Sequence, residues 1–257
     1  MGRHERVAEL ADLAGARGLA GAGDPVVVAD LGCGEGRTVR TLLAHSPDVV
    51  HAIDRVSALA DDLLTDARVR SRIADLDEPD LPVEPSSLHR VVSLNVAEHL
   101  LDPVGHLVAC HRALRPGGLV VLAHSDWDTA LFTSTDDGLT RALVDRFVDV
   151  VPTWAERTDG FMGRKLLALA NAATLRGAPF ELVSVDSWAD PHRRFDDGSV
   201  AWKVAMGMLA AARDLPDLAA RAAGWVEGLR SLADAGQFLF TVTDVAVVLR
   251  KPVLLAT

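Results

Sequence analysis

Tyrosine is absent from this 257-residue chain, and cysteine and long apolar runs are scarce. Without tyrosine, no phenol can serve as a base or an oxyanion donor. Cys33 and Cys110 lie far apart and form neither a C-x-x-C pair nor a zinc pattern, so we expect buried thiols and no metal site. No apolar run approaches the roughly 20 residues that span a bilayer, and the charged N-terminus lacks a signal-peptide core. We therefore expect a cytoplasmic protein with no membrane partner.

Basic charge is also in short supply, because 36 acidic residues outnumber 26 basic ones and the formal net charge is −10. Nucleic-acid binding depends largely on Lys and Arg side chains that neutralise phosphates. The charge balance therefore indicates that neither RNA nor DNA is a partner.

What the chain does have is a glycine loop after an apolar strand, in V-V-V-A-D-L-G-C-G-E-G at positions 26–36. The β-branched run is typical of a buried parallel strand, and Asp30 closes it. Gly32, Gly34 and Gly36 permit positive φ angles and remove side chains that would keep a ligand from the backbone N–H groups. We expect a ligand loop followed by a helix, whose N-terminal end favours an anionic group.

The spacing of these glycines distinguishes two nucleotide ligands. A dinucleotide fingerprint, G-x-G-x-x-G, would place its third glycine where this chain has Arg37. The pattern acid-x-G-x-G-x-G instead resembles motif I of class I S-adenosylmethionine (SAM) dependent methyltransferases. Four further segments follow in the order of that family: 49–54 (VVHAID), 73–76 (IADL), 88–100 (LHRVVSLNVAEHL) and 112–118 (RALRPGG). One departure is Leu88-His89, where the family usually has Phe-Asp.

The resemblance implies SAM as cofactor and S-adenosylhomocysteine (SAH) as product. Asp54 can accept hydrogen bonds from both ribose hydroxyls, since an ionised carboxylate only accepts. The resemblance gives Asp75 the adenine amino group. The expected cofactor-binding residues are Asp30, Gly32, Gly34, Gly36, Asp54, Arg55, Asp75, Leu76 and Asn95.

Alternating strands and helices predict an α/β fold with a doubly wound, seven-stranded, mostly parallel sheet and a helical cap inserted late in the chain. Within it we expect helices over 5–16, 37–44 and 57–70. We expect a single domain over 1–257, divided into an N-terminal helix or lid (1–24), a SAM-binding core (25–124), cap segments (125–178 and 190–235) and a terminal antiparallel strand pair (179–189 and 236–251).

Candidate catalytic residues follow the fourth and fifth strands. A base is needed only if the acceptor arrives protonated, and His124 and Asp126 are the first candidates, with His99 next. Each has an alternative as a capping or packing residue.

Candidate acceptor-binding residues are Trp127 and Asp128, expected in a loop after the fifth strand, and Trp154. Tryptophans can form a cage around a cationic acceptor, although large aromatics more often belong to a core. Asp126, Asp128 and Asn95 could also provide oxygen ligands to a divalent metal, but carboxylates two apart in a loop commonly only form turns, and we expect no metal.

Together these features predict a SAM-dependent N- or O-methyltransferase of the small-molecule, ubiquinone-biosynthesis-type group, acting in secondary metabolism. A SAM-fold enzyme of other chemistry, such as a cyclase or hydroxylase, and a non-catalytic SAM-binding scaffold are the alternatives. The sequence leaves open the acceptor, the methylated atom and whether the chain is a monomer or a homodimer.

Overall fold

The computed structural model describes residues 2–151 and 156–253 and divides the chain into two compact units. The first unit comprises Met1–His124, Lys165–Asp186 and Val245–Thr257, and the second comprises Ser125–Arg164 and Ser187–Asp244. The chain passes between them at four places, after residues 124, 164, 186 and 244. The expectation of one domain over 1–257, with its subdivisions, stays a prediction.

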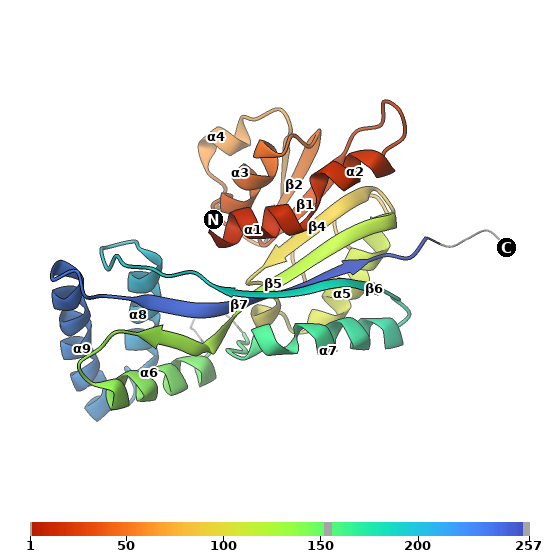
Figure 1. The fold of residues 1–257 in the computed structure, drawn as a ribbon. Helices are drawn as coiled ribbons and strands as arrows, with labels where there is room; N and C mark the ends of the chain where they lie inside the picture. The colour runs from red at the N-terminus through yellow and green to blue at the C-terminus, as the bar shows by residue number, and fades with distance from the viewer. Residues whose placement is uncertain (1, 152–155, 254–257) are drawn as a thin grey trace. The chain divides into compact units, whose positions relative to one another are not determined.

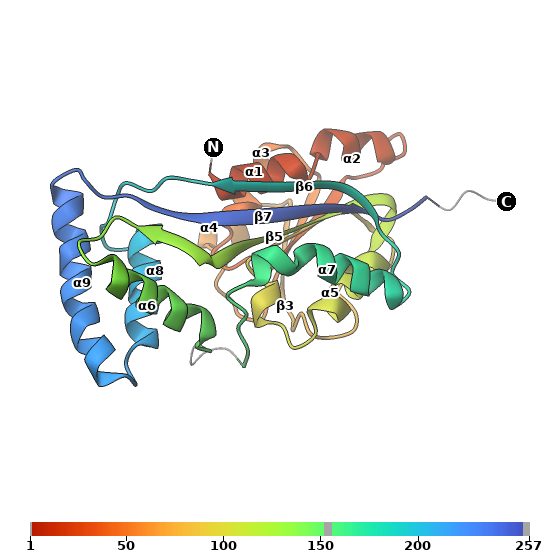
Figure 2. The same ribbon diagram turned by 60° about the horizontal axis from the view of Figure 1, so that its bottom comes forward.

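Within the described residues, the strands form one seven-stranded sheet with the order β3-β2-β1-β4-β5-β7-β6 (Figure 1). The strands are β1 (Val27–Leu31), β2 (Val49–Asp54), β3 (Val69–Ile73), β4 (Leu88–Leu94), β5 (Leu114–Phe132), β6 (Glu181–Ala189) and β7 (Phe240–Arg250). β1 pairs in parallel with β2 and β4, β2 with β3, and β4 with β5. The arrow of β7 points against those of β5 and β6 (Figures 1 and 2). The predicted α/β, mostly parallel fold is confirmed.

The strand order reverses between β1 and β4, which is where sheets of this kind bind ligands, outside the carboxyl ends of the strands. The glycine loop follows β1 and leads into α3 (Arg37–Ala44), whose bounds agree with the expected helix. The other helices of the first unit are α1 (Arg3–Leu10), α2 (Leu13–Leu19), α4 (Asp61–Leu64), the 3-10 turn η1 (Ala97–His99), α5 (Pro103–Ala113) and most of α7 (Met162–Leu175).

Two expected helices differ from the structure. The helix over 5–16 is broken at Asp12, which has a φ of 46° and caps α2 by accepting from the Gly15 N–H. Its broken end is held by the buried Arg90 guanidinium, which donates to the carbonyls of Ala11 and Asp12. The prediction of a helix over 57–70 is wrong. Only the four residues of α4 are helical in this segment, because Val69 already pairs with Val50 in the parallel ladder.

The second unit has its own core between β5, β7 and three helices, α6 (Asp137–Asp149), α8 (Val200–Ala211) and α9 (Pro216–Asp234). Phe132 lies at its centre, with its ring centroid 4.5 Å from that of Phe240 and 5.2 Å from that of Trp225. The Trp225 indole N–H donates to Thr140 at 2.9 Å, which satisfies its polar atom inside the core. None of the described helices has the length and apolar character needed to cross a bilayer.

Candidate functional site

The glycine loop adopts the positive φ angles that its sequence predicts: 70° at Gly32, 49° at Gly34 and 87° at Gly36. The N–H groups of Gly32 and Cys33 both donate to the carbonyl of Ile53, at 2.8 and 3.2 Å. The loop is therefore tied to the end of β2 by its own backbone.

The three glycines, however, face different surroundings. A Cβ added to Gly32 would collide with Val96, and one added to Gly36 would collide with Leu63 and Leu59. At Gly34 a Cβ would meet no heavy atom within 4 Å. Gly32 and Gly36 are therefore also needed for packing, and the roles of the three glycines toward a ligand stay predictions.

Asp54, the last residue of β2, is bound to this loop. Its Oδ2 accepts the Gly34 N–H at 2.8 Å, and its Oδ1 accepts the Val56 N–H at 3.2 Å. Each carboxylate oxygen has two lone pairs, so each retains an acceptor position. The half-buried carboxylate can thus hold the loop and still receive a diol.

Asp30 lies under the loop, only 2% exposed. Burial, reinforced by the nearby charge of Asp54, raises the pKa of the Asp30 carboxyl to about 8. A cation beside it would lower that pKa again, because an opposite charge favours the ionised form. A positively charged group close to Asp30 would therefore be stabilised by the ionised carboxylate.

The remaining expected cofactor residues line the same edge of the first unit. Asp75 and Arg55 are exposed, and Leu76 is buried. Asp75 Oδ1 accepts the Asp77 N–H at 3.0 Å, which orders the turn after β3. Asn95 follows β4 with a φ of 57°, and its N–H donates to the Ala123 carbonyl. The roles of these residues toward a cofactor stay predictions.

Two of the candidate bases share one acid that the sequence analysis did not single out. Glu98 is 5% exposed, and its Oε1 lies 3.2 Å from His99 Nε2 and 3.7 Å from His124 Nε2. The His124 side chain is fully buried, whereas that of His99 is 25% exposed. Of the two imidazoles, that of His99 is the more exposed, although its Nδ1 atom is buried. Glu98 could have been found from the sequence, because it directly precedes the candidate base His99.

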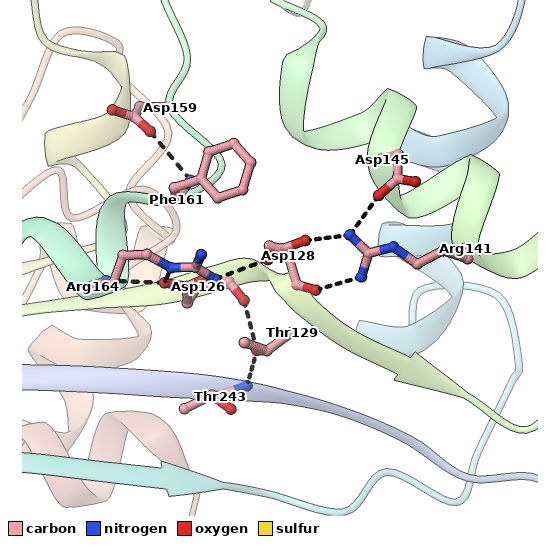
Figure 3. Close-up of polar contacts among 9 residues, drawn as sticks. All are labelled: Asp126, Asp128, Thr129, Arg141, Asp145, Asp159, Phe161, Arg164 and Thr243. Carbon is pink, nitrogen blue, oxygen red and sulfur yellow. Dashed lines mark hydrogen bonds and ion pairs between the residues drawn. The ribbon is translucent and has the colours of Figure 1, made fainter.

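Asp126, the third candidate base, lies in an ion-pair network of the second unit (Figure 3). Its carboxylate is 4% exposed and accepts from Arg164 Nε at 2.8 Å, from Arg164 Nη2 at 2.7 Å and from the Arg164 backbone N–H at 3.0 Å. The backbone of Gly163 passes so close to Asp126 that a Cβ there would lie 2.8 Å from the Asp126 Cβ. Asp126 thus both caps the first turn of α7 and holds its arginine.

Asp128 extends this network. It accepts from Arg164 Nη2 at 3.0 Å and from the Arg141 side chain, and these bonds hold the pKa of its carboxyl below the usual range, that from Arg141 most strongly. Arg164 also lies over the Phe161 ring, 5.1 Å from its centroid. No sequence motif marked Arg164 or Gly163.

Trp127 and Asp128 lie on β5, not in the expected loop, because β5 continues to Phe132. Trp127 packs edge-to-face on Phe147, with ring centroids 5.8 Å apart, and is partly buried against the core of the second unit. Trp154 lies outside the described residues.

Known proteins resemble this chain both in sequence and in fold. Residues 29–122 match the family described as methyltransferase domain, which confirms the resemblance found in the sequence. Among curated proteins, the chain is 32% identical over 149 residues to a 37.1 kDa transposon protein of Streptomyces fradiae and 31% identical over 102 residues to the ubiquinone biosynthesis O-methyltransferase of Roseobacter denitrificans. These alignments cover 55% and 37% of this chain and about two fifths of the relatives, 41% and 39%.

Solved structures share the fold over a larger part of the chain. A candidate type II methyltransferase from Anaeromyxobacter dehalogenans has a TM-score of 0.55 at 19% identity and covers 97% of this chain and 95% of its own. A geranyl diphosphate methyltransferase in complex with SAM has a TM-score of 0.51 at 16% identity, covering 95% of this chain and 85% of its own. At these identities the likeness concerns the fold alone.

Proposed function

We propose that this chain, whose residues 29–122 are a methyltransferase domain, binds SAM and transfers its methyl group to a nitrogen or oxygen atom of a small molecule. The ubiquinone O-methyltransferase among its relatives and the geranyl diphosphate enzyme among its structural neighbours support a small acceptor. The formal charge of −10 also favours a small acceptor over a nucleic acid.

The observation that carries the proposal is the pairing of Gly34 with Asp54 where the strand order reverses. The space beside Gly34 where a side chain would lie is open. The Gly34 N–H donates to the Asp54 carboxylate, which keeps two further acceptor positions. A nucleoside needs this combination, since its diol requires acceptors and its sugar must approach the backbone closely. Asp75 and Leu76 would then hold the adenine, with Arg55 and Asn95 nearby.

SAM, when bound, supplies a sulfonium carbon that already carries a good leaving group. The protein's task is to position the acceptor in line with that carbon, which can be worth about 7–11 kcal/mol of barrier. We assign Asp30 to the positive charge of the cofactor, because the raised pKa of this carboxyl makes a neighbouring cation favourable.

For a protonated acceptor, we assign the base to His99, oriented by Glu98. Nε2 faces the acid, so the proton would go to Nδ1, which is buried and which an acceptor reaches only if neighbouring side chains move. The Glu98 carboxylate lies within hydrogen-bonding distance of His99 Nε2, at 3.2 Å. The buried His124 lies beside the same carboxylate, with its Nε2 3.7 Å from Glu98 Oε1. Asp126, with its carboxylate occupied by Arg164, is assigned a structural role instead. Contacts of Trp127, Asp128 and Trp154 with an acceptor stay predictions.

The proposal is tested by isothermal titration of the wild type, Asp54→Asn and Asp234→Asn with SAM and SAH. We expect the Asp54 variant to bind SAH about 10- to 150-fold more weakly, because it loses a charge-assisted interaction worth about 1.5–3 kcal/mol. Asp234, an exposed residue at the end of α9, provides the control, and its variant should bind like the wild type.

Radioactive methyl transfer from SAM to a panel of phenols and amines then identifies the acceptor class. Unchanged SAH affinity in Asp54→Asn would refute the assignment of that carboxylate. If wild-type protein bound neither SAM nor SAH at millimolar concentration, the methyltransferase proposal itself would fail.

A further inference from the structure

The first unit has a concavity on the sheet that none of the glycine-loop residues lines. It has a volume of about 540 Å³, within the range of about 300–1,000 Å³ usual for small-molecule sites. Val27 and Val49 are the first residues of β1 and β2, so the pocket begins at the amino ends of these strands. It extends along β3 to Arg72, which pairs with Ile53. Its lining consists of Val27, Val49, His51, Arg70, Arg72, Leu81, Pro82, Val83, Glu84 and Ser87.

The pairing register gathers three nitrogen-bearing side chains on one face of the sheet. His51 is paired with Arg70 across β2 and β3, and paired residues of neighbouring strands point to the same face. Arg72 is two residues further along β3 and therefore shares that face. Burial and then the charges of Arg72 and Arg70 lower the pKa of His51, which agrees with guanidinium groups beside the imidazole.

These groups have unused hydrogen-bonding capacity. His51 Nδ1 is buried and has no hydrogen-bond partner among the described residues. Arg70 donates through Nη1 to the carbonyls of Ala67 and Val69, at 2.6 and 3.0 Å. Arg72 is exposed, and its side chain forms no hydrogen bond or ion pair with the residues that the structure describes. A buried polar atom without a partner is costly, so a ligand that paired with it would gain binding energy.

The other side of the pocket is apolar. Leu81, Pro82 and Val83 follow one another in the segment before β4 and, with Val27 and Val49, make up the apolar part of the lining. Glu84 is the single carboxylate of the lining, against two arginines, so the pocket carries a local charge of +1 with His51 neutral. This local positive charge is opposite in sign to the formal net charge of the whole chain, which is −10.

We propose that this pocket is a binding site for a small organic anion, with a carboxylate or phosphate group on Arg72, Arg70 and His51 and an apolar body against residues 81–83. Planar guanidinium groups suit such oxyanions. The site is distinct from the glycine loop, since His51 and Asp54 are three residues apart on β2 and therefore point to opposite faces of the sheet. It does not depend on the proposed methyl transfer.

The arginines of this pocket also have a simpler explanation. β3 is an edge strand of the sheet, and charged residues on edge strands prevent pairing with other chains. That account explains the exposure of Arg70 and Arg72. It explains neither the unpartnered His51 Nδ1 nor the apolar wall. The two accounts differ in whether a ligand is bound, and binding can be measured.

The test is calorimetric titration of the full chain with phenyl phosphate and with benzoate as probes, and with inorganic phosphate and benzyl alcohol as partial ligands. We expect at least one of the two aromatic anions to bind with a dissociation constant at least tenfold lower than either partial ligand. Arg72→Gln and His51→Phe should each weaken that binding by tenfold or more. Arg213→Gln, which removes an exposed arginine of the second unit, is the charge-matched control and should bind like the wild type.

The preferred probe distinguishes a phosphate ester from a carboxylate as the natural head group. If neither aromatic anion bound at millimolar concentration, or if Arg213→Gln weakened binding as much as Arg72→Gln, the site would be disproved. Titration of each variant with SAH provides the folding control: its affinity should be unchanged if the pocket is separate from the glycine loop. Loss of SAH binding in Arg72→Gln would contradict that separation.

Discussion

At the scale of single residues, the glycine loop shows one motif performing two tasks. Gly32 and Gly36 make room for Val96, Leu59 and Leu63, whereas Gly34 has nothing within 4 Å of its missing Cβ. All three have positive φ, so a substitution at any of them carries a backbone penalty of about 1–2 kcal/mol. Only the first two add a steric collision to it.

We therefore expect Gly34→Ala to fold with a loss of about 1–2 kcal/mol in the free energy of unfolding but to bind SAH at least tenfold more weakly, because the new methyl group occupies the open flank. Gly32→Ala should lose several kcal/mol, from overpacking as well as strain. Urea denaturation and calorimetric titration measure the two effects. Val96→Ala combined with Gly32→Ala is the matched control and should recover part of the stability.

The sequence predicted the loop but not this division. Spacing alone identified the strand over 49–54 and the helix over 37–44, whose bounds agree with β2 and α3. The neighbours that crowd Gly32 and Gly36 come from η1 and α4 and their flanks, segments far along the chain, so no local pattern could indicate which glycine faces a ligand. The same holds for Asp30, whose raised pKa arises from burial and from Asp54.

At the scale of elements, β5 is the main departure from the sequence prediction. The segment after His124 has alternate acidic residues and was expected to be a loop, yet it continues as strand to Phe132. Its acids are tolerated because partners from other elements meet them: Arg164 from α7 and Arg141 from α6 (Figure 3). A strand stabilised by such distant partners cannot be recognised from its own residues.

Asp126→Asn should lower the free energy of unfolding by about 1–3 kcal/mol, since it removes the charge that holds Arg164 and the first turn of α7. The loss stays moderate because the Arg164 side chain is 49% exposed and can be solvated. Urea denaturation checks this expectation. SAH affinity should be unchanged, and Arg141→Gln, at a 55% exposed side chain, should cost less than 1 kcal/mol. A variant with full stability but no methyl transfer would instead restore Asp126 as a base.

At the scale of the whole molecule, Asp30 couples stability to pH. Its folded pKa of about 8 lies above the ordinary value of 3.8 for an aspartate, so the folded protein retains this proton more tightly than the unfolded chain. The contribution of Asp30 to the free energy of unfolding is therefore fully present at acid pH and is lost as pH rises from about 4 to 8. Within that window the slope is at most about 1.4 kcal/mol per pH unit.

Between pH 6 and pH 8, we expect the wild type to lose about 2 kcal/mol of stability relative to Asp30→Asn, which cannot ionise. Thermal unfolding checks this, because about 1 kcal/mol corresponds to 2–4 °C in a chain of this size. Saturating SAM should reduce the difference by stabilising the ionised carboxylate, and Asp234→Asn should follow the wild type. Parallel pH profiles for the wild type and Asp30→Asn would contradict the assignment.

The four crossings between the two units have a consequence for how such a protein can be altered. Neither unit is a continuous stretch of chain, and three of the crossings fall inside β5, β6 and β7. Exchange of an entire unit between homologues would need breakpoints at all of these crossings, three of them within strands, and is therefore disfavoured. New acceptor preferences in such a scaffold should arise by point replacement or by insertions in connecting loops, with the strand framework inherited intact.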